Sequence, residues 1–199
     1  MRRRLILVAL AAFSTRAFAA TAISAGQVLR GRFVQERRLH GFDAPLRTEG
    51  HFVLAPGRGL IWRAETPFAV TTVITEAGLV QQIDGSEILR LPAARLPFLS
   101  RLYGMLNGAL SGDWQALEPD FVIVRSGDAA HWRTELTPRR PDAIGMPLRA
   151  ITVAGSQFVD QVLIEKPEGD SESLVFLDQI LSTGPLRPEE AASLASAGP

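Results

Sequence analysis

Residues 49–75, EGHFVLAPGRGLIWRAETPFAVTTVIT, decide the fold class of this chain. Large apolar residues alternate with polar ones in successive short runs, which is typical of strands with one buried face. Gly57-Arg58-Gly59, directly after Pro56, is suited to a tight turn between the first two runs. Because strands joined by tight turns must run antiparallel, the stretch predicts part of an antiparallel sheet.

The same pattern of apolar runs, separated by Gly, Pro and Asp, continues along most of the chain. Strands are expected at residues 31–39, 48–55, 60–65, 68–75, 79–83, 87–91, 121–125, 131–137, 148–153, 158–165 and 173–181. About ten or eleven antiparallel strands are too many for a flat open sheet. We therefore expect a mainly β (α+β) chain folded as an incomplete, half-open antiparallel β-barrel.

Two segments are expected to be helical. Apolar residues recur at helical spacing through residues 99–110, where Gly104 and Gly108 each weaken the helix by about 1 kcal/mol relative to alanine. We expect this loose apolar helix to cover the open side of the barrel as a lid. Pro188 and the two glutamates after it are typical of the first turn of a short C-terminal helix.

The first nineteen residues have the organisation of an export signal. Three arginines precede the apolar residues 5–13, and Ala17-Phe18-Ala19 is suited to cleavage after Ala19. Such a start serves the general and the twin-arginine export routes alike. The chain has no cysteine, and therefore no thiol for a lipid anchor, a disulfide or a metal. We expect residues 20–199 to form a single soluble domain in the periplasm.

Composition and motifs exclude several functions. Lys+Arg and Asp+Glu are balanced at 21 each, which argues against nucleic-acid binding. His40, His51 and His131 are far apart in the sequence, so no metal site and no cofactor are expected. There is no Gly-x-Ser-x-Gly elbow and no glycine-rich phosphate loop before a helix. Scattered carboxylates could still meet across a sheet, so a hydrolase or ester-transfer enzyme stays an alternative.

Every second residue of a barrel strand faces the interior, so the sequence predicts what lines it. An ordinary packed core and a ligand pocket both fit an apolar interior. The sheet is wider than its own side chains can fill, and this favours the pocket. The expected pocket wall is formed by Phe52, Leu54, Trp62, Phe68, Val70 and Ile74. The expected lid residues are Leu99, Leu102, Met105 and Leu106.

Short motifs spread over most of the chain resemble one known family. They are Phe33-x-Gln35, Gly50, Pro56 followed by Trp62, Pro67, Gly78, Leu110-Ser111-Gly112-Asp113, Trp132-x-x-x-Leu136-Thr137-Pro138, and residues 179–186. In these features the chain is similar to the LolA family of periplasmic outer-membrane lipoprotein carriers, and especially to its divergent LolA-like branch.

The resemblance implies a non-enzymatic, monomeric carrier that shields acyl chains in an apolar cavity during transfer between an inner-membrane donor and an outer-membrane acceptor. Ala55 stands where typical lipoprotein carriers have an arginine, and the segment before Phe33 is short. The cargo is therefore left open between a lipoprotein and a lipid-like molecule such as a glycolipid or a polyene. A scaffold of an envelope export system is a further alternative.

Overall fold

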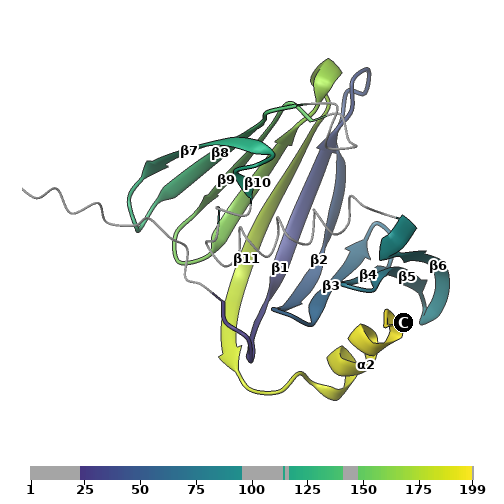
Figure 1. Cartoon of the computed structure of the whole chain (residues 1–199). Helices are drawn as coiled ribbons and strands as arrows, with labels where there is room; N and C mark the ends of the chain where they lie inside the picture. The colour runs from purple at the N-terminus through teal and green to yellow at the C-terminus, as the bar shows by residue number, and fades with distance from the viewer. Residues whose placement is uncertain (1–22, 96–113, 115–116, 141–147, 199) are drawn as a thin grey trace, which may run out of the picture.

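The computed structural model of the chain describes residues 23–95, 114, 117–140 and 148–198. Within these ranges eleven strands form one antiparallel sheet, in the order β6-β5-β4-β3-β2-β1-β11-β10-β9-β8-β7. The strands are β1 (Gln27–Arg38), β2 (Leu46–Ala55), β3 (Gly59–Thr66), β4 (Val70–Thr75), β5 (Gly78–Ile83), β6 (Ser86–Pro92), β7 (Phe121–Gly127), β8 (Trp132–Pro138), β9 (Ala150–Gly155), β10 (Val159–Glu165) and β11 (Ser171–Thr183). The sheet ends at β6 and β7, which do not pair with each other (Figure 1). The predicted half-open barrel is confirmed.

The first and last strands of the chain join two antiparallel meanders. β1 pairs with β2 on one side and with β11 on the other, and β11 continues the sheet through β10 to β7. These three strands are the longest and run through the middle of the molecule (Figure 1). The sheet is therefore held at its centre by contacts between opposite ends of the sequence.

Strand register brings the apolar residues of the opening stretch onto one face. Leu29, Leu54, Leu60, Ile74 and Leu79 are successive cross-strand partners from β1 to β5. A neighbouring row contains the cross-strand partners Phe52 and Trp62. We call the face of the sheet that carries these two rows the inner face. The alternate residues form the outer face. The alternation of apolar residues along each strand thus gives one continuous apolar face across five strands.

Apolar clusters cover both faces of the sheet. Two clusters on the inner face, one around Trp132 and Phe121 and one around Phe33 and Phe52, are bridged by Phe176 of β11. A third cluster on the outer face joins the sheet to α2 (Pro188–Ser196). Its members are Val28, Ala55, Ile61, Val73, Val80, Leu194 and Ala197. The C-terminal helix therefore packs against the outer face of β4 through Val73.

The C-terminal helix begins as the sequence predicts, with Pro188 in its first turn and two glutamates after it. Two 3₁₀ turns, η1 (Ala93–Arg95) and η4 (Pro167–Gly169), complete the described helical segments. None of the described helices is both long and apolar enough to cross a membrane. The expected lid helix at residues 99–110 lies outside the described residues.

Strand ends differ from expectation at a few places. β1 begins at Gln27, four residues before its expected start, and β4 begins at Val70, two residues after its expected start.

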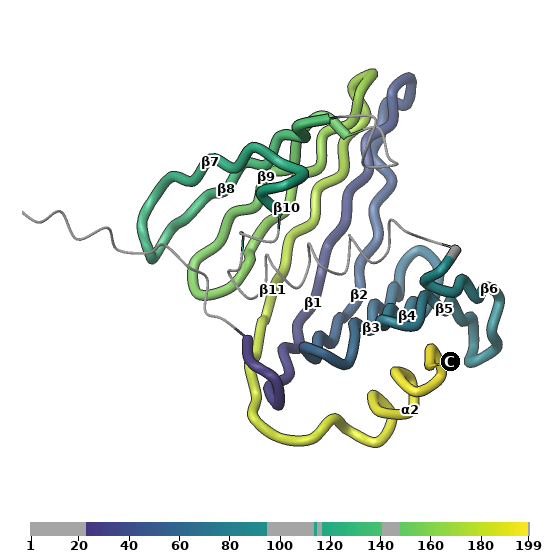
Figure 2. The backbone as a smooth tube through the Cα atoms, in the orientation of Figure 1, coloured from purple at the N-terminus to yellow at the C-terminus, as the bar shows by residue number. Residues whose placement is uncertain are grey.

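The β1–β2 and β10–β11 connections lie side by side at one end of the long central strands (Figure 2). The backbone N–H of His40 donates a hydrogen bond of 2.7 Å to the carboxylate of Asp170 there. This bond ties the two connections together.

Candidate functional site

Four aromatic rings form the centre of the inner face. The rings of Phe33 and Trp62 are stacked, with 3.7 Å between their centroids and 24° between their planes. Phe176 meets Phe52 edge-on at 5.3 Å and Trp62 at 6.1 Å. Edge-to-face and stacked rings contribute more than their buried area alone. These residues come from β1, β2, β3 and β11, so the cluster connects four neighbouring strands.

Two glycines in the strands that carry this cluster have no room for a side chain. Gly50 is the cross-strand partner of both Phe33 and Ala64, and an added Cβ there would lie 1.9 Å from the carbonyl oxygen of Arg63. A Cβ on Gly31 would lie 2.7 Å from Cε1 of Phe52. Any larger residue at either position would displace the backbone or the aromatic ring. The family motif residue Gly50 therefore has a steric role in this structure.

The expected wall residues occupy different environments. Phe52, Leu54 and Ile74 are buried, with 4%, 3% and 8% of their surface exposed. Trp62 and Val70 are half-buried on the same face. Phe68 precedes β4 and is 76% exposed, so it does not pack with the other five. A role for any of the six in cargo binding stays a prediction.

The expected lid residues, Leu99, Leu102, Met105 and Leu106, lie outside the described residues. What covers the inner face is therefore not part of the described geometry. Phe176 was not among the residues expected at the site. It lies in the expected strand 173–181, which has apolar residues at both alternating sets of positions. The sequence pattern therefore does not indicate which set faces inward.

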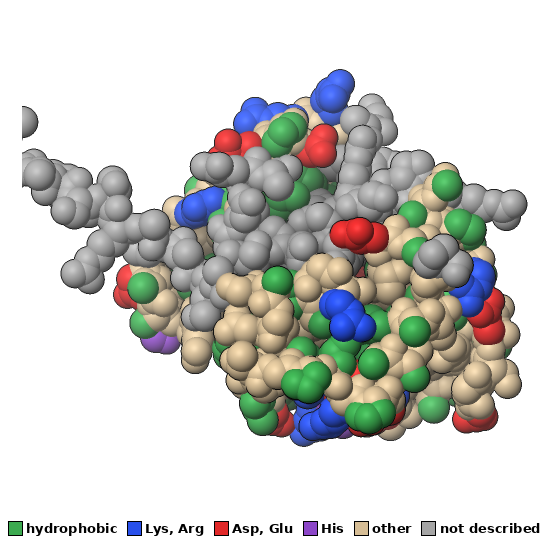
Figure 3. Space-filling view, turned by 60° about the horizontal axis from the view of Figure 1, so that its bottom comes forward, with side chains coloured by type: hydrophobic (Ala, Val, Ile, Leu, Met, Phe, Trp, Pro, Cys, Tyr) green, Lys and Arg blue, Asp and Glu red, His purple; other side chains and the backbone are tan. Residues whose placement is uncertain are grey.

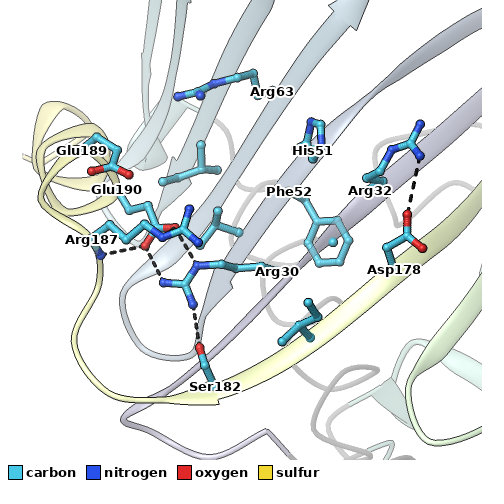
Figure 4. A pocket seen from close by; sticks show the side chains of 14 residues that line it. Arg30, Arg32, His51, Phe52, Arg63, Asp178, Ser182, Arg187, Glu189 and Glu190 are labelled. Carbon is cyan, nitrogen blue, oxygen red and sulfur yellow. Dashed lines mark hydrogen bonds and ion pairs between the residues drawn. The ribbon is translucent and has the colours of Figure 1, made fainter.

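An open groove of about 500 Å³ lies on the outer face, between the sheet and the start of α2 (Figure 4). It is lined by Arg30, Gly31, Arg32, His51, Phe52, Val53, Ile61, Arg63, Asp178, Ile180, Ser182, Arg187, Glu189 and Glu190. A β-bulge in β11 shapes the floor of the groove. Arg30 pairs with Ile180 but Arg32 pairs with Leu177, so β11 has one extra residue at this point. Asp178, within the bulge, has a φ of 51°. The extra residue bends β11 and turns Asp178 and Ile180 outward.

An ion pair closes one end of the groove. Arg30 donates two hydrogen bonds to the carboxylate of Glu190, at 2.7 and 2.6 Å, and a third to the Ser182 hydroxyl at 2.6 Å. Glu190 also accepts a hydrogen bond from the backbone N–H of Arg187 at 2.8 Å, which caps α2. The Arg30 hydrogen bonds are the main reason why the pKa of Glu190 is lowered, and burial opposes this shift only in part. The carboxylate is therefore held ionised.

Other charges line the rest of the groove. Arg32 lies 3.5 Å from Asp178, and both side chains are largely exposed. His51 Nδ1 lies 2.9 Å from a carboxylate oxygen of Glu65. Arg63 forms no ion pair with any described residue, and its side chain reaches toward the α2 side of the groove (Figure 4). The lining thus combines four guanidinium groups with three carboxylates.

The described residues offer little for acid–base or metal chemistry. No group of three His, Asp or Glu side chains among them is placed to hold a metal ion. Glu190 is the buried charged residue of the described core, and both of its oxygens are bonded to Arg30. A carboxylate bound in this way anchors a helix rather than transferring a proton.

Charged side chains are dispersed over the surface. In Figure 3 the basic and acidic groups of the described residues lie in small groups separated by polar and apolar surface. Some described charges form short-range pairs, such as Glu87 with Arg90 and Arg47 with Glu36 and Glu49. A broad basic field, as nucleic-acid binding requires, does not appear on the described part of this face.

Sequence reasoning missed the groove because its residues are distant in the chain. Arg30 and Glu190 are 160 positions apart, and neither belongs to a local motif that indicates the other. The adjacent glutamates of α2 were expected only to stabilise the start of the helix. Pairing of β1 with β11 is what brings Arg30 beside α2.

One known protein family matches most of this chain in sequence. Residues 17–169 match the family model described as outer membrane lipoprotein carrier protein LolA-like. No curated protein matches the chain. Among solved structures, a LolA superfamily protein from Nitrosomonas europaea is 9% identical, with 83% of this chain and 89% of that chain covered and a TM-score of 0.42.

Two further solved structures are similar at the same low level. The complex of MucA and MucB from Pseudomonas aeruginosa is 14% identical, covering 82% of this chain and 54% of that chain, with a TM-score of 0.42. A putative outer membrane lipoprotein-sorting protein domain from Vibrio parahaemolyticus is 11% identical, covering 85% and 91%, with a TM-score of 0.36. All three TM-scores are below 0.5, so the family assignment rests on the sequence match.

Proposed function

The chain belongs to the LolA-like family of outer membrane lipoprotein carrier proteins, and from this premise we propose that it carries a lipidated or lipid-like cargo against its inner face. The observation that carries the proposal is the continuous apolar row from Leu29 to Leu79 across five strands of a sheet that does not close. The side chains of such a face can pack against an extended acyl chain.

The energetics of acyl binding support this use of the face. Each methylene removed from water contributes about 0.8 kcal/mol, so about ten buried methylenes contribute roughly 8 kcal/mol. This is enough to hold a chain that is insoluble in water. The ends of the sheet at β6 and β7 remain unpaired with each other, so the face does not enclose its cargo permanently.

Further parts of the proposal follow from the export signal and the family. We place the carrier in the periplasm as a monomer, after removal of residues 1–19, with residues 20–199 as one domain. Its partners would be an inner-membrane donor and an outer-membrane acceptor, and it would need no cofactor, metal or catalytic residue. The cargo would be a lipoprotein or a lipid-like molecule held by the expected wall and lid residues.

Purification from the native host tests the proposal directly. The protein should carry an extractable lipid or lipidated peptide that mass spectrometry identifies. The delipidated protein should then bind a fluorescent fatty acid such as a parinaric acid. A protein that is purified empty and also refuses the probe would contradict the proposal.

Two adjacent threonines provide a matched pair of variants for the inner face. Thr72 is the cross-strand partner of Trp62 and lies on the inner face, whereas Thr71 is the partner of Arg63 on the outer face. Both are half-buried on β4. Thr72→Arg should abolish probe binding, because it places a charge against the apolar row, and Thr71→Arg should leave it unchanged. Equal effects of the two variants would contradict binding at this face.

A non-enzymatic scaffold is the second candidate, and a specific observation favours it. Leu29, Phe33 and Phe52 are already packed, with 0%, 1% and 4% of their surface exposed. A face that is filled in this way can serve as ordinary core. A scaffold would bind no acyl probe, and Thr72→Arg would then lower stability without any binding to lose.

A further inference from the structure

We propose that the groove on the outer face is a second ligand site, and that it takes a small amphipathic monoanion, a carboxylate joined to a short apolar group. The groove lies on the opposite side of the sheet from the proposed cargo face. Its volume of about 500 Å³ is in the range of sites for small molecules. The site is separate from the proposed carrier function and does not depend on it.

The floor of the groove is apolar. Val53, Ile61 and Ile180 contribute aliphatic side chains from three strands. Ile180 is 66% exposed, although its neighbour across the sheet is the half-buried Arg30. A large aliphatic side chain turned outward by a bulge, beside a helix, leaves apolar surface that a ligand can cover.

The charges around this floor determine the sign of the ligand. The four arginines exceed the three carboxylates by one, and two of these carboxylates, Glu190 and Asp178, are already paired with Arg30 and Arg32. Arg63 has no ion-pair partner among the described residues, and Arg187 lies 4.0 Å from Glu190, which is already bonded twice to Arg30. The excess of one positive charge favours a single negative charge, and a carboxylate is a monoanion whose two oxygens match the geometry of a guanidinium group.

The site is preorganised. Arg30 is fixed by Glu190 and Ser182, and α2 is fixed to the sheet by Leu194 and Ala197 of the outer cluster. The sheet and helix that frame the groove therefore need little rearrangement when a ligand enters, which lowers the cost of binding. Figure 4 shows these groups around one open space, with Arg63 and His51 on its far side from Ser182.

Three probes test the chemistry. Isothermal titration calorimetry of the full-length mature protein should detect binding of octanoate, which has both the charge and the apolar chain. Octyl glucoside has a chain of the same length without charge, and acetate has the charge without the chain. Both should bind at least about tenfold more weakly, because each lacks one half of the recognition.

Variants then locate the binding. Arg63→Ala should weaken octanoate binding about tenfold, the loss expected for one charge-assisted hydrogen bond. Ile180→Asp should abolish it, because the floor becomes acidic. Arg133→Ala, an exposed arginine on β8 outside the groove, should leave it unchanged. Both Arg63 and Ile180 are exposed, so neither change threatens the core.

The inner-face variant separates this proposal from the proposed function. Thr72→Arg removes acyl-chain binding at the inner face, so the octanoate binding that remains in this variant should be the part that Arg63→Ala weakens. If octanoate binding is lost in Thr72→Arg and retained in Arg63→Ala, the octanoate occupies the inner face and the groove proposal is overturned. If no variant changes it, or acetate binds as well as octanoate, the proposal is equally overturned.

A further comparison identifies the natural source of the carboxylate. A short fatty acid and the C-terminus of an apolar peptide share this chemistry. Octanoate binding without binding of N-acetyl-Ala-Leu-Val would indicate a fatty acid, and the reverse would indicate a peptide C-terminus. If neither probe binds, the groove is not a site for this chemistry.

Discussion

Arg30 on β1 and Glu190 on α2 are 160 positions apart in the sequence, and their side chains form a two-point ion pair with hydrogen bonds of 2.7 and 2.6 Å. The Arg30 side chain is 19% exposed and that of Glu190 7%. The pair anchors the start of the C-terminal helix to the centre of the sheet. It also forms one end of the outer-face groove.

Removing one charge of this pair should destabilise the protein. Glu190→Gln leaves the Arg30 guanidinium without its charged partner, and breaking a buried pair typically costs about 3 kcal/mol or more. Because Arg30 is partly exposed, we expect about 2 to 3 kcal/mol, measured by urea unfolding. Glu189→Gln is the matched control, since its exposed side chain forms no ion pair within the described residues and should change stability little. Equal effects of the two substitutions would show that the pair is not an anchor.

Stability should also depend on pH through Glu190. Its folded pKa lies below the unfolded value of about 4.3, so the native state holds the proton less tightly than the unfolded chain. The contribution is therefore complete above the unfolded pKa and is lost as the pH falls through the folded pKa. The difference in unfolding free energy between wild type and Glu190→Gln should shrink from pH 7 toward pH 3. A constant difference over this range would contradict the assignment.

Gly31→Ala should destabilise the sheet by overpacking. The added Cβ would lie 2.7 Å from Cε1 of Phe52 and 2.9 Å from the carbonyl oxygen of Leu177. Forcing such a contact typically costs about 1 to 3 kcal/mol, and thermal unfolding would measure it. Phe52→Leu removes the ring atoms that the new Cβ would meet. Gly31→Ala should therefore cost less stability in the Phe52→Leu protein than in the wild type. If the cost is equal in both proteins, the strain comes from the backbone rather than from the ring.

Trp62 should report cargo on the inner face by fluorescence. The chain has three tryptophans, so Trp114→Phe with Trp132→Phe leaves Trp62 as the single emitter. A dibrominated fatty acid should quench it strongly, since Trp62 is half-buried beside the apolar row. The matched protein that retains only Trp132, which is 5% exposed and belongs to the other inner cluster, should be quenched less. Stronger quenching of Trp132 would move the proposed cargo site to the β7–β10 half of the sheet.

Much of the fold could be predicted from local pattern. Strand alternation, tight turns and the proline before two glutamates are short-range features, and they correctly placed the eleven strands and α2. Strand ends were less accurate: Phe68 was expected inside the fourth strand and lies before it. Its apolar side chain fitted the alternation, but alternation does not indicate where backbone pairing starts.

The candidate site was predicted less completely than the fold. Phe52, Leu54, Trp62 and Ile74 share one face, as their spacing of two indicates. The cluster that Trp62 joins also includes Phe33 and Phe176, because β1 pairs with both β2 and β11. Pairing of strands so far apart in the chain is a long-range event that no local window contains.

The sequence by itself determined that this chain forms a wide antiparallel sheet with an apolar inner face, because the alternation of side chains is a local property of each strand. Only the tertiary structure decided that Arg30 meets Glu190, that Gly31 makes room for Phe52, and that a bulge in β11 opens a groove behind the sheet. These relationships depend on register and on contacts between the two ends of the chain, and they arise only when the whole sheet is assembled.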